Sequence, residues 1–207
     1  MTNYQSVFKK IGILIVFYVV FPKMNTQAQL LDSLALNTMV AFTSLEEALK
    51  NPEAVIKLEL RKKKLKNFPV EITQFINLQY LDLSKNSIKE IPAEIGKLKN
   101  LQHLAISKTG LQELVPQIGE LKNLYYLNLN QNELSSLPME IGKLENLKTL
   151  DLWSNNIDTF PDEIKNLNNL KILDLRVILI PDEEQNRVQY LLPHTKIHFS
   201  PYCKCQQ

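Results

Sequence analysis

The sequence predicts an α/β fold that is built by stacking short repeats into a solenoid. Segments of the form L-x-x-L-x-L/I open at Leu78, Leu101, Leu124, Leu147 and Leu170, with a period of 23 residues and no insertion. Each unit offers about seven apolar positions, which contribute on the order of 10 to 20 kcal/mol if they are fully buried. Ordering the backbone costs roughly 1 to 2 kcal/mol per residue, so one unit cannot fold alone. The units must therefore stack on one another, as in other repeat proteins.

The N-terminus predicts export. Residues 1–10 are polar and end in Lys9 and Lys10, residues 11–21 are apolar without interruption, and a polar stretch follows to Ala28. This is the layout of a secretory signal, and the apolar run is shorter than the ~20 residues that a spanning helix needs. We expect a signal peptide at residues 1–28 with cleavage after Ala28, and an uncleaved membrane tether is the alternative. The mature chain is then periplasmic, on the cell surface or secreted, with no stable membrane span.

Composition and charge narrow the possible functions. The chain has 207 residues with 24 bases and 22 acids, and removing residues 1–28 takes away three lysines and no acid, which leaves 21 bases and 22 acids. Only five glycines are present, which disfavours glycine-rich phosphate loops. A basic cluster at residues 61–64 with Lys66 is either a solvated edge or a contact for an acidic partner, a glycan or a phospholipid surface. No aromatic residue interleaves this cluster, so we expect no nucleic-acid partner.

An N-terminal capping segment is expected at residues 29–54, before the first repeat. The sequence SLEE at residues 44–47 is a capping-box pattern, and it predicts a short helix that ends near Pro52. Residues 30–42 are rich in leucine, and they either extend this cap or stay loosely ordered.

The repeats occupy residues 55–180 and number about six. Asn86, Asn132 and Asn155 stand in the turn after each expected strand, where an amide can bond the backbone of adjacent turns. Thr109 and Ile178 take this position in the third and sixth copies, so the row of asparagines is interrupted there, and the register of residues 177–180 stays open.

The repeat sequence L-P-x-E-I-G-x-L-x-N resembles the leucine-rich repeat family. It is similar to the 23-residue class of bacterial repeat proteins and of Ras-group-related repeat proteins of eukaryotes. The resemblance implies a right-handed solenoid, a short horseshoe with the L-x-x-L-x-L segments as parallel strands on a concave sheet and helical turns or extended segments on the convex side. The repeat style, the signal and the absence of Asn-x-Ser/Thr sequons together indicate a bacterial protein.

A C-terminal cap and a Cys-x-Cys tail are expected at residues 181–207. Residues 181–192 read as a helix that Pro193 stops, and residues 195–199 read as a final strand. Cys203 and Cys205 form a lone C-x-C pair, which is a weak zinc signal. In an exported chain they can form a disulfide, pair between molecules or stay reduced.

No residues form a recognisable catalytic or metal-binding constellation, so we expect no enzyme, no metal and no cofactor. Alternation along the strands points the third, fifth and seventh residues of each unit away from the core. We expect this concave face to bind a protein partner, since exposed aromatic residues dominate interfaces. A glycan-binding or envelope-structural role is the alternative, and the aromatic residues could instead stack across strands and stabilise the sheet. The candidate residues are Tyr80, Asp82, His103, Tyr126, Asn128, Asp151, Trp153, Asp174 and Arg176.

Overall fold

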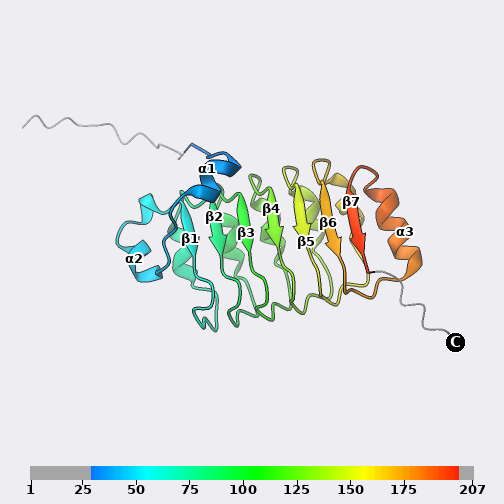
Figure 1. Cartoon of the computed structure of the whole chain (residues 1–207), viewed down its shortest axis with the longest axis horizontal. Coiled ribbons are helices and arrows are strands. Elements are labelled where there is room, and N and C mark those ends of the chain that lie inside the picture. Colours follow the sequence, from blue (N-terminus) through cyan, green and yellow to red (C-terminus); the bar gives the residue numbers. More distant parts are fainter. Residues whose placement is uncertain (1–28, 201–207) are drawn as a thin grey trace, which may run out of the picture.

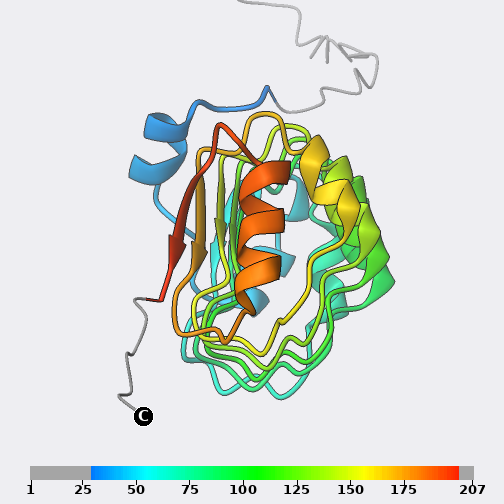
Figure 2. The same cartoon turned by 90° about the vertical axis from the view of Figure 1, so that its right-hand side faces the viewer.

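The computed structural model describes residues 29–200 of the chain. The expected signal peptide at residues 1–28 and the cysteines Cys203 and Cys205 lie outside the described residues. Within them the chain forms one solenoid, with strands along one side and short helices along the other (Figure 1; Figure 2).

Seven parallel strands form one open sheet in the order β1 to β7. Successive pairs from β1 to β6 align residues that are 23 apart, such as Tyr80 with His103, so the sequence period sets the register. The last pair aligns Ile172 with Lys196, which are 24 residues apart. Val177 has the same positive φ as Ser154 one repeat earlier, so residues 177–180, whose register the sequence left open, start in the register of the earlier repeats. The strands are β1 (Lys57–Glu59), β2 (Tyr80–Asp82), β3 (His103–Ala105), β4 (Tyr126–Asn128), β5 (Thr149–Asp151), β6 (Ile172–Leu175) and β7 (Lys196–Phe199).

Short 3₁₀ helices line the opposite side of the solenoid. Proline caps the N-terminus of four of them, where its fixed φ suits the entry and its missing N–H is not needed. These helices are η2 (Val70–Gln74), η3 (Ala93–Lys97), η4 (Pro116–Glu120), η5 (Met139–Lys143) and η6 (Asp162–Asn166).

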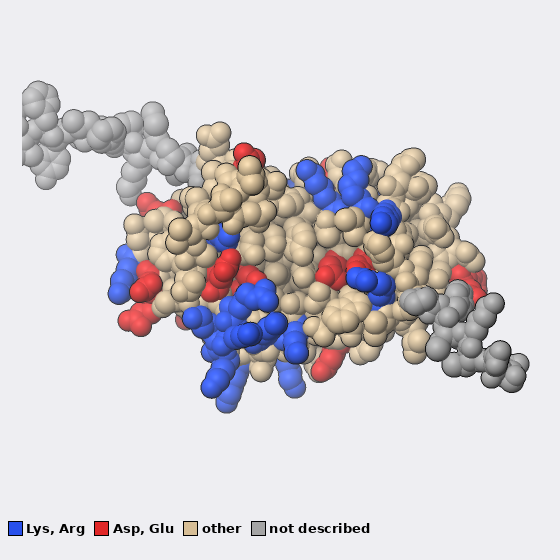
Figure 3. All heavy atoms as spheres, viewed as in Figure 1, with Lys and Arg blue, Asp and Glu red and all other residues tan. Residues whose placement is uncertain are grey.

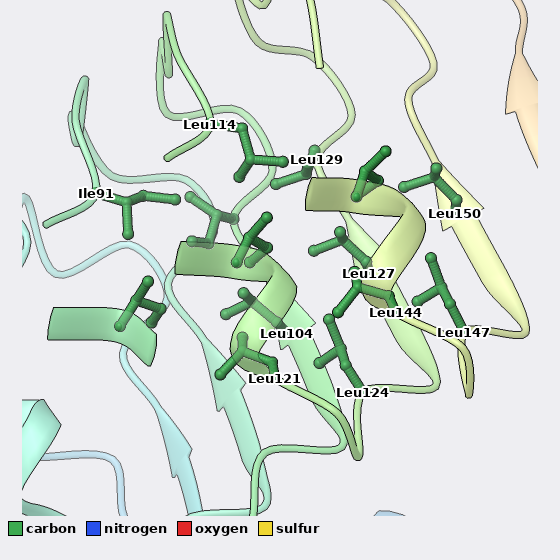
Figure 4. Close-up of a cluster of buried hydrophobic side chains, with 14 of the residues drawn as sticks. Ile91, Leu104, Leu114, Leu121, Leu124, Leu127, Leu129, Leu144, Leu147 and Leu150 are labelled. Carbon is green, nitrogen blue, oxygen red and sulfur yellow. The ribbon is translucent and has the colours of Figure 1, made fainter. Parts of the chain in front are cut away.

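The core lies between the sheet and the 3₁₀ helices, and it is one continuous cluster of leucine and isoleucine side chains (Figure 4). Each repeat contributes one layer of side chains to this cluster, and each layer packs against the layers of the neighbouring repeats. Adjacent 3₁₀ helices also pack tightly at glycine, since a Cβ atom on Gly142 would lie 2.3 Å from the carbonyl oxygen of Glu163. The repeats are therefore held together along both sides of the solenoid.

Two rows of asparagines bond the repeats to one another. The amide of Asn132 donates to the carbonyls of Ile106 and Leu129, and its oxygen accepts backbone N–H groups of the preceding repeat. Thr109 does not replace an asparagine, because its hydroxyl donates to Asn132 Oδ1 instead. The second row was not recognised in the sequence. Each member donates to a carbonyl 24 residues earlier, and the row is Asn77, Asn100, Asn123, Asn146 and Asn169.

The N-terminal end is closed by α1 (Ser33–Thr38), α2 (Leu45–Leu49) and η1 (Pro52–Ala54). The capping prediction is confirmed, because Ser44 Oγ accepts the backbone N–H of Glu47. Phe42 pairs in parallel with Leu58 and so shields the free edge of β1. Residues 30–42 are thus ordered, which decides between the two alternatives for this segment.

The C-terminal end is closed by α3 (Asp182–Leu191), followed by β7. Both were predicted and both are confirmed. Among the acids in the first turn of α3, Glu184 is buried and does more than favour the helix dipole. Its carboxylate accepts the Phe160 N–H at 2.9 Å and pairs with the Arg187 guanidinium at 2.7 Å, so it connects α3 to the fifth repeat.

Candidate functional site

The candidate residues lie on the outer face of the sheet, hereafter the sheet face. Their elements are β2 to β6 and the turns directly after these strands. The third residue of each unit forms one column across the strands, and the fifth and seventh residues form two more. The three columns differ strongly in what their side chains do.

The third column forms a stacked ladder of Lys57, Tyr80, His103 and Tyr126. The Lys57 ammonium lies 4.6 Å from the centre of the Tyr80 ring, which is cation–π geometry. The His103 ring lies between the two tyrosines, with ring centres 4.0 and 4.3 Å apart and nearly parallel planes. Cross-strand stacking, one of the two alternatives for these aromatic residues, therefore occurs at Tyr80, His103 and Tyr126.

Burial within the ladder shifts the pKa of its rings. Burial, supported by the nearby charge of Lys57, lowers the pKa of His103 to about 4, although Asp82 opposes this shift. His103 Nδ1 is buried and has no hydrogen-bond partner among the described residues. Burial and the carboxylates of Asp82 and Glu59 raise the pKa of Tyr80 to about 12. The ladder is thus neutral at its rings near pH 7, and His103 is poorly suited to act as a base.

The N-terminal segment covers the first part of the sheet face. In both views α1 lies outside the strands, over the start of the sheet (Figure 1; Figure 2). Lys57 Nζ donates to the carbonyls of Leu36 and Asn37 at 3.3 and 3.0 Å, and Gln102 Nε2 donates to the Leu31 carbonyl at 3.0 Å. The Leu36 side chain is fully buried although it is not part of the main core. The N-terminal segment therefore contacts Lys57, the first member of the ladder, directly.

The fifth column is mainly structural. A side-chain oxygen of Asp82, Asn128, Asp151 and Asp174 accepts the backbone N–H two residues further on, which forms an Asx turn at each strand end. Asp82 is also buried and pairs with Arg61 at 2.6 Å, so it is not available to a partner. The recurrence of Asp or Asn at this position was the signal for this role, and sequence reasoning had assigned these residues to binding alone.

The last three repeats leave the sheet face open. This open end comprises Asn130, Asp151, Trp153, Asp174 and Arg176, with Ile172 beside them. Asn130 Nδ2 donates to Asp151 Oδ2 at 2.6 Å, and Arg176 forms an ion pair with Asp174 at 2.6 Å. The indole N–H of Trp153 donates to no residue in the described part of the chain.

The two carboxylates of the open end differ in their pKa. Burial raises the pKa of Asp151, and hydrogen bonds from Asn130 and from the Trp153 backbone only partly oppose it. Burial also acts on Asp174, but the hydrogen bonds and the charge of Arg176 outweigh it and lower the pKa. Asp174 is thus ionised near pH 7, and its charge is already paired with that of Arg176. Asp151 is partly desolvated and accepts a hydrogen bond from the Asn130 amide.

Residues 29–200 contain neither a candidate metal cluster nor a candidate membrane helix. No cluster of three or more His, Cys, Asp or Glu side chains there could hold a metal ion. No helix within the same residues is long and apolar enough to cross a membrane.

Comparison with known proteins agrees with this architecture. A family model described as a leucine-rich repeat region matches residues 53–130 and 115–191. A comparison with curated proteins finds no match. Among solved structures, the leucine-rich repeat protein LIC12759 of Leptospira interrogans is 37% identical with a TM-score of 0.67, and the alignment covers 77% of this chain and 40% of that protein.

Two further structures place the fold in other settings. Internalin C2 of Listeria monocytogenes is 25% identical with a TM-score of 0.65, over 77% of this chain and 67% of that one. The ectodomain of a membrane receptor kinase of Arabidopsis thaliana, solved with Casparian strip integrity factor 2, is 28% identical with a TM-score of 0.59, over 71% and 18%. With its repeats, its register and these matches, the chain belongs to the leucine-rich repeat family.

Proposed function

We propose that this chain is an exported, non-enzymatic binding module that holds a protein partner on the open end of its sheet face. Leucine-rich repeat proteins typically serve protein–protein interaction, and two similar structures contain a receptor with its ligand, one of them a plant peptide hormone receptor with RGF2. This chain spans 40% of the Leptospira protein and smaller shares of both receptors, so the proposal concerns the module alone.

The observation that carries the proposal is that Trp153 lies on the sheet face without a partner for its indole among the described residues. It is the single tryptophan of the sequence, it lies half-buried on the sheet face, and its indole has no partner in residues 29–200. Ile172 on the neighbouring strand is 41% exposed and lies opposite Thr149, so it adds apolar surface to the same face. Tryptophan and arginine are enriched among the residues that dominate binding energy. Trp153 and Arg176 are therefore the proposed anchors, while Tyr80, His103 and Tyr126 stack on one another across the strands.

Capture with matched variants tests this site. Residues 29–207, immobilised, should capture a partner that a Trp153→Ala, Arg176→Ala double variant loses. Tyr190→Ala is the control, because Tyr190 is 83% exposed on α3 and lies outside the sheet face. Titration of the captured partner should change the fluorescence of Trp153, the only indole of this chain, after the fluorescence of the partner alone is subtracted. Equal capture by both variants, or a partner that leaves the fluorescence unchanged, would remove the open end as the site.

Export is tested separately. The full chain, expressed in a bacterial host, should appear outside the cytoplasm with Gln29 as its first residue, because cleavage is proposed after Ala28. The polar start, the apolar run at residues 11–21 and the small residue Ala28 support this step. Intact chain in the cytosol would overturn export without affecting the proposed site on the sheet face.

A further inference from the structure

A second surface with a different chemistry lies at one edge of the sheet, where β1, β2 and β3 end. The repeat period brings lysines from three successive turns together there, and Figure 3 shows the resulting basic group below these strands. We call this surface the basic ridge, and its members are Lys62, Lys63, Lys64, Lys66, Lys85 and Lys108.

The charge of the basic ridge is not neutralised within the described chain. All six side chains are exposed, and none of them forms an ion pair there. Arg61 differs from them, because it is paired with Asp82. Two acids, Glu90 and Glu113, lie further along the same connections and reduce the positive charge without cancelling it. The ridge is therefore a concentrated positive surface on a nearly neutral protein.

The backbone does not require lysine at this edge. Lys62, Lys85 and Lys108 have φ values of 55°, 60° and 55°, a left-handed conformation that glycine or asparagine adopts more readily. The same position has φ values of 53° and 58° in later repeats, where it carries Gln131 and Ser154. Lysine thus occurs only in the first three repeats, although the backbone geometry is the same throughout. Its side chain, and not its conformation, distinguishes this edge.

We propose that the basic ridge binds the surface of an anionic lipid bilayer. Clusters of four to eight basic residues are attracted to anionic headgroups, and each residue near the surface contributes independently. Lysine carries a compact point charge, whereas arginine carries a planar group that bonds one phosphate in a fixed geometry. A surface of lysines therefore suits contact with many headgroups better than precise binding of a single phosphate. An apolar contact lies next to the ridge, since Lys66 and the 51% exposed Val70 line the same open hollow. No aromatic ring belongs to the ridge to stack on a sugar or a base.

Vesicle binding tests this proposal with residues 29–207, which contain every described helix and strand. The probes are vesicles of phosphatidylcholine alone and of phosphatidylcholine with phosphatidylglycerol. The chain should bind only the anionic vesicles, and binding should weaken as salt is added. The variant Lys62→Gln, Lys85→Gln, Lys108→Gln should bind about 100-fold more weakly, given the contribution of each lysine near such a surface. Gln131 already occupies this backbone position, so the variant is expected to fold.

A second triple variant supplies the control. Lys148, Lys171 and Lys196 are exposed at the opposite edge of the sheet, where β5 to β7 begin, and their change to glutamine removes the same charge. This control should bind anionic vesicles within about threefold of the unmodified chain. Equal loss in both triple variants, or no binding to anionic vesicles, would overturn the proposal. Ridge-dependent binding to heparin without binding to vesicles would assign the ridge to a sulfated glycan and would also overturn it.

Discussion

Replacing Asn132 with alanine should reveal how strongly the asparagine row stabilises the solenoid. The side chain is buried, and its loss leaves three backbone N–H groups and one backbone carbonyl without their partners. At about 1 kcal/mol for each such group, reduced because several donors share one oxygen, the free energy of unfolding should fall by about 3 kcal/mol. The groups concerned are the N–H of Thr109, Gly110 and Leu111 and the carbonyl of Ile106, whereas the carbonyl of Leu129 still accepts from Asn155.

Two other asparagines provide a graded comparison. Asn155 bonds one backbone N–H and two carbonyls, one of which also accepts from Asn132, so Asn155→Ala should cost about 2 kcal/mol. Asn100 donates to a single carbonyl, and Asn100→Ala should cost about 1 kcal/mol. Urea unfolding followed by circular dichroism measures all three variants, with an unchanged m-value showing that the unfolding remains comparable. A different rank order, or a loss below about 1 kcal/mol for Asn132→Ala, would refute the assignment of stability to these bonds.

Three further variants test separate features of the fold. Gly142→Ala should lower the free energy of unfolding in urea by about 2 to 3 kcal/mol, because the new Cβ would meet the backbone of the next repeat. In Gly96→Ala the new Cβ meets a flexible glutamate side chain, so the loss should be less than about 1 kcal/mol. Equal losses in the two variants would contradict this explanation. His103 takes up a proton near pH 4 when folded and near its ordinary pKa of 6.5 when unfolded, so the unfolded state binds more protons between these values and stability falls with falling pH. Between pH 7 and pH 4.5 the free energy of unfolding of His103→Phe should therefore fall by about 2 kcal/mol less than that of the unmodified chain. Parallel pH profiles of the two proteins would show that His103 does not cause the loss of stability at low pH. Val177 is β-branched at a φ of 58°, so Val177→Asn should raise stability by about 1 kcal/mol in thermal unfolding, and no gain would mean that this position is unstrained.

The repeat architecture could be predicted because it depends on residues within one unit. The opening leucines recur at a fixed spacing, as do the asparagine after three of the strands and the proline before four of the 3₁₀ helices, and similar units stack in the same register. The period of 23 therefore already contained the pairing of Tyr80 with His103. Both end caps were also predictable, because the capping pattern at Ser44 and the helix before Pro193 are local signals.

The state of the candidate site depended on contacts that no local pattern reveals. The sequence placed Tyr80 and Trp153 alike on the outer face of the sheet, but Tyr80 is stacked between Lys57 and His103, whereas the indole of Trp153 has no partner in residues 29–200. Further contacts join the N-terminal segment to side chains more than 20 residues away, since Lys57 donates to Leu36 and Gln102 donates to Leu31. The gathering of lysines at the basic ridge, by contrast, follows from the period, since stacking brings residues 23 apart to neighbouring positions. The sequence by itself thus determined the repeating unit and its register, whereas the tertiary structure decided which outward side chains have partners, because that depends on contacts between distant residues and not on the pattern of one unit.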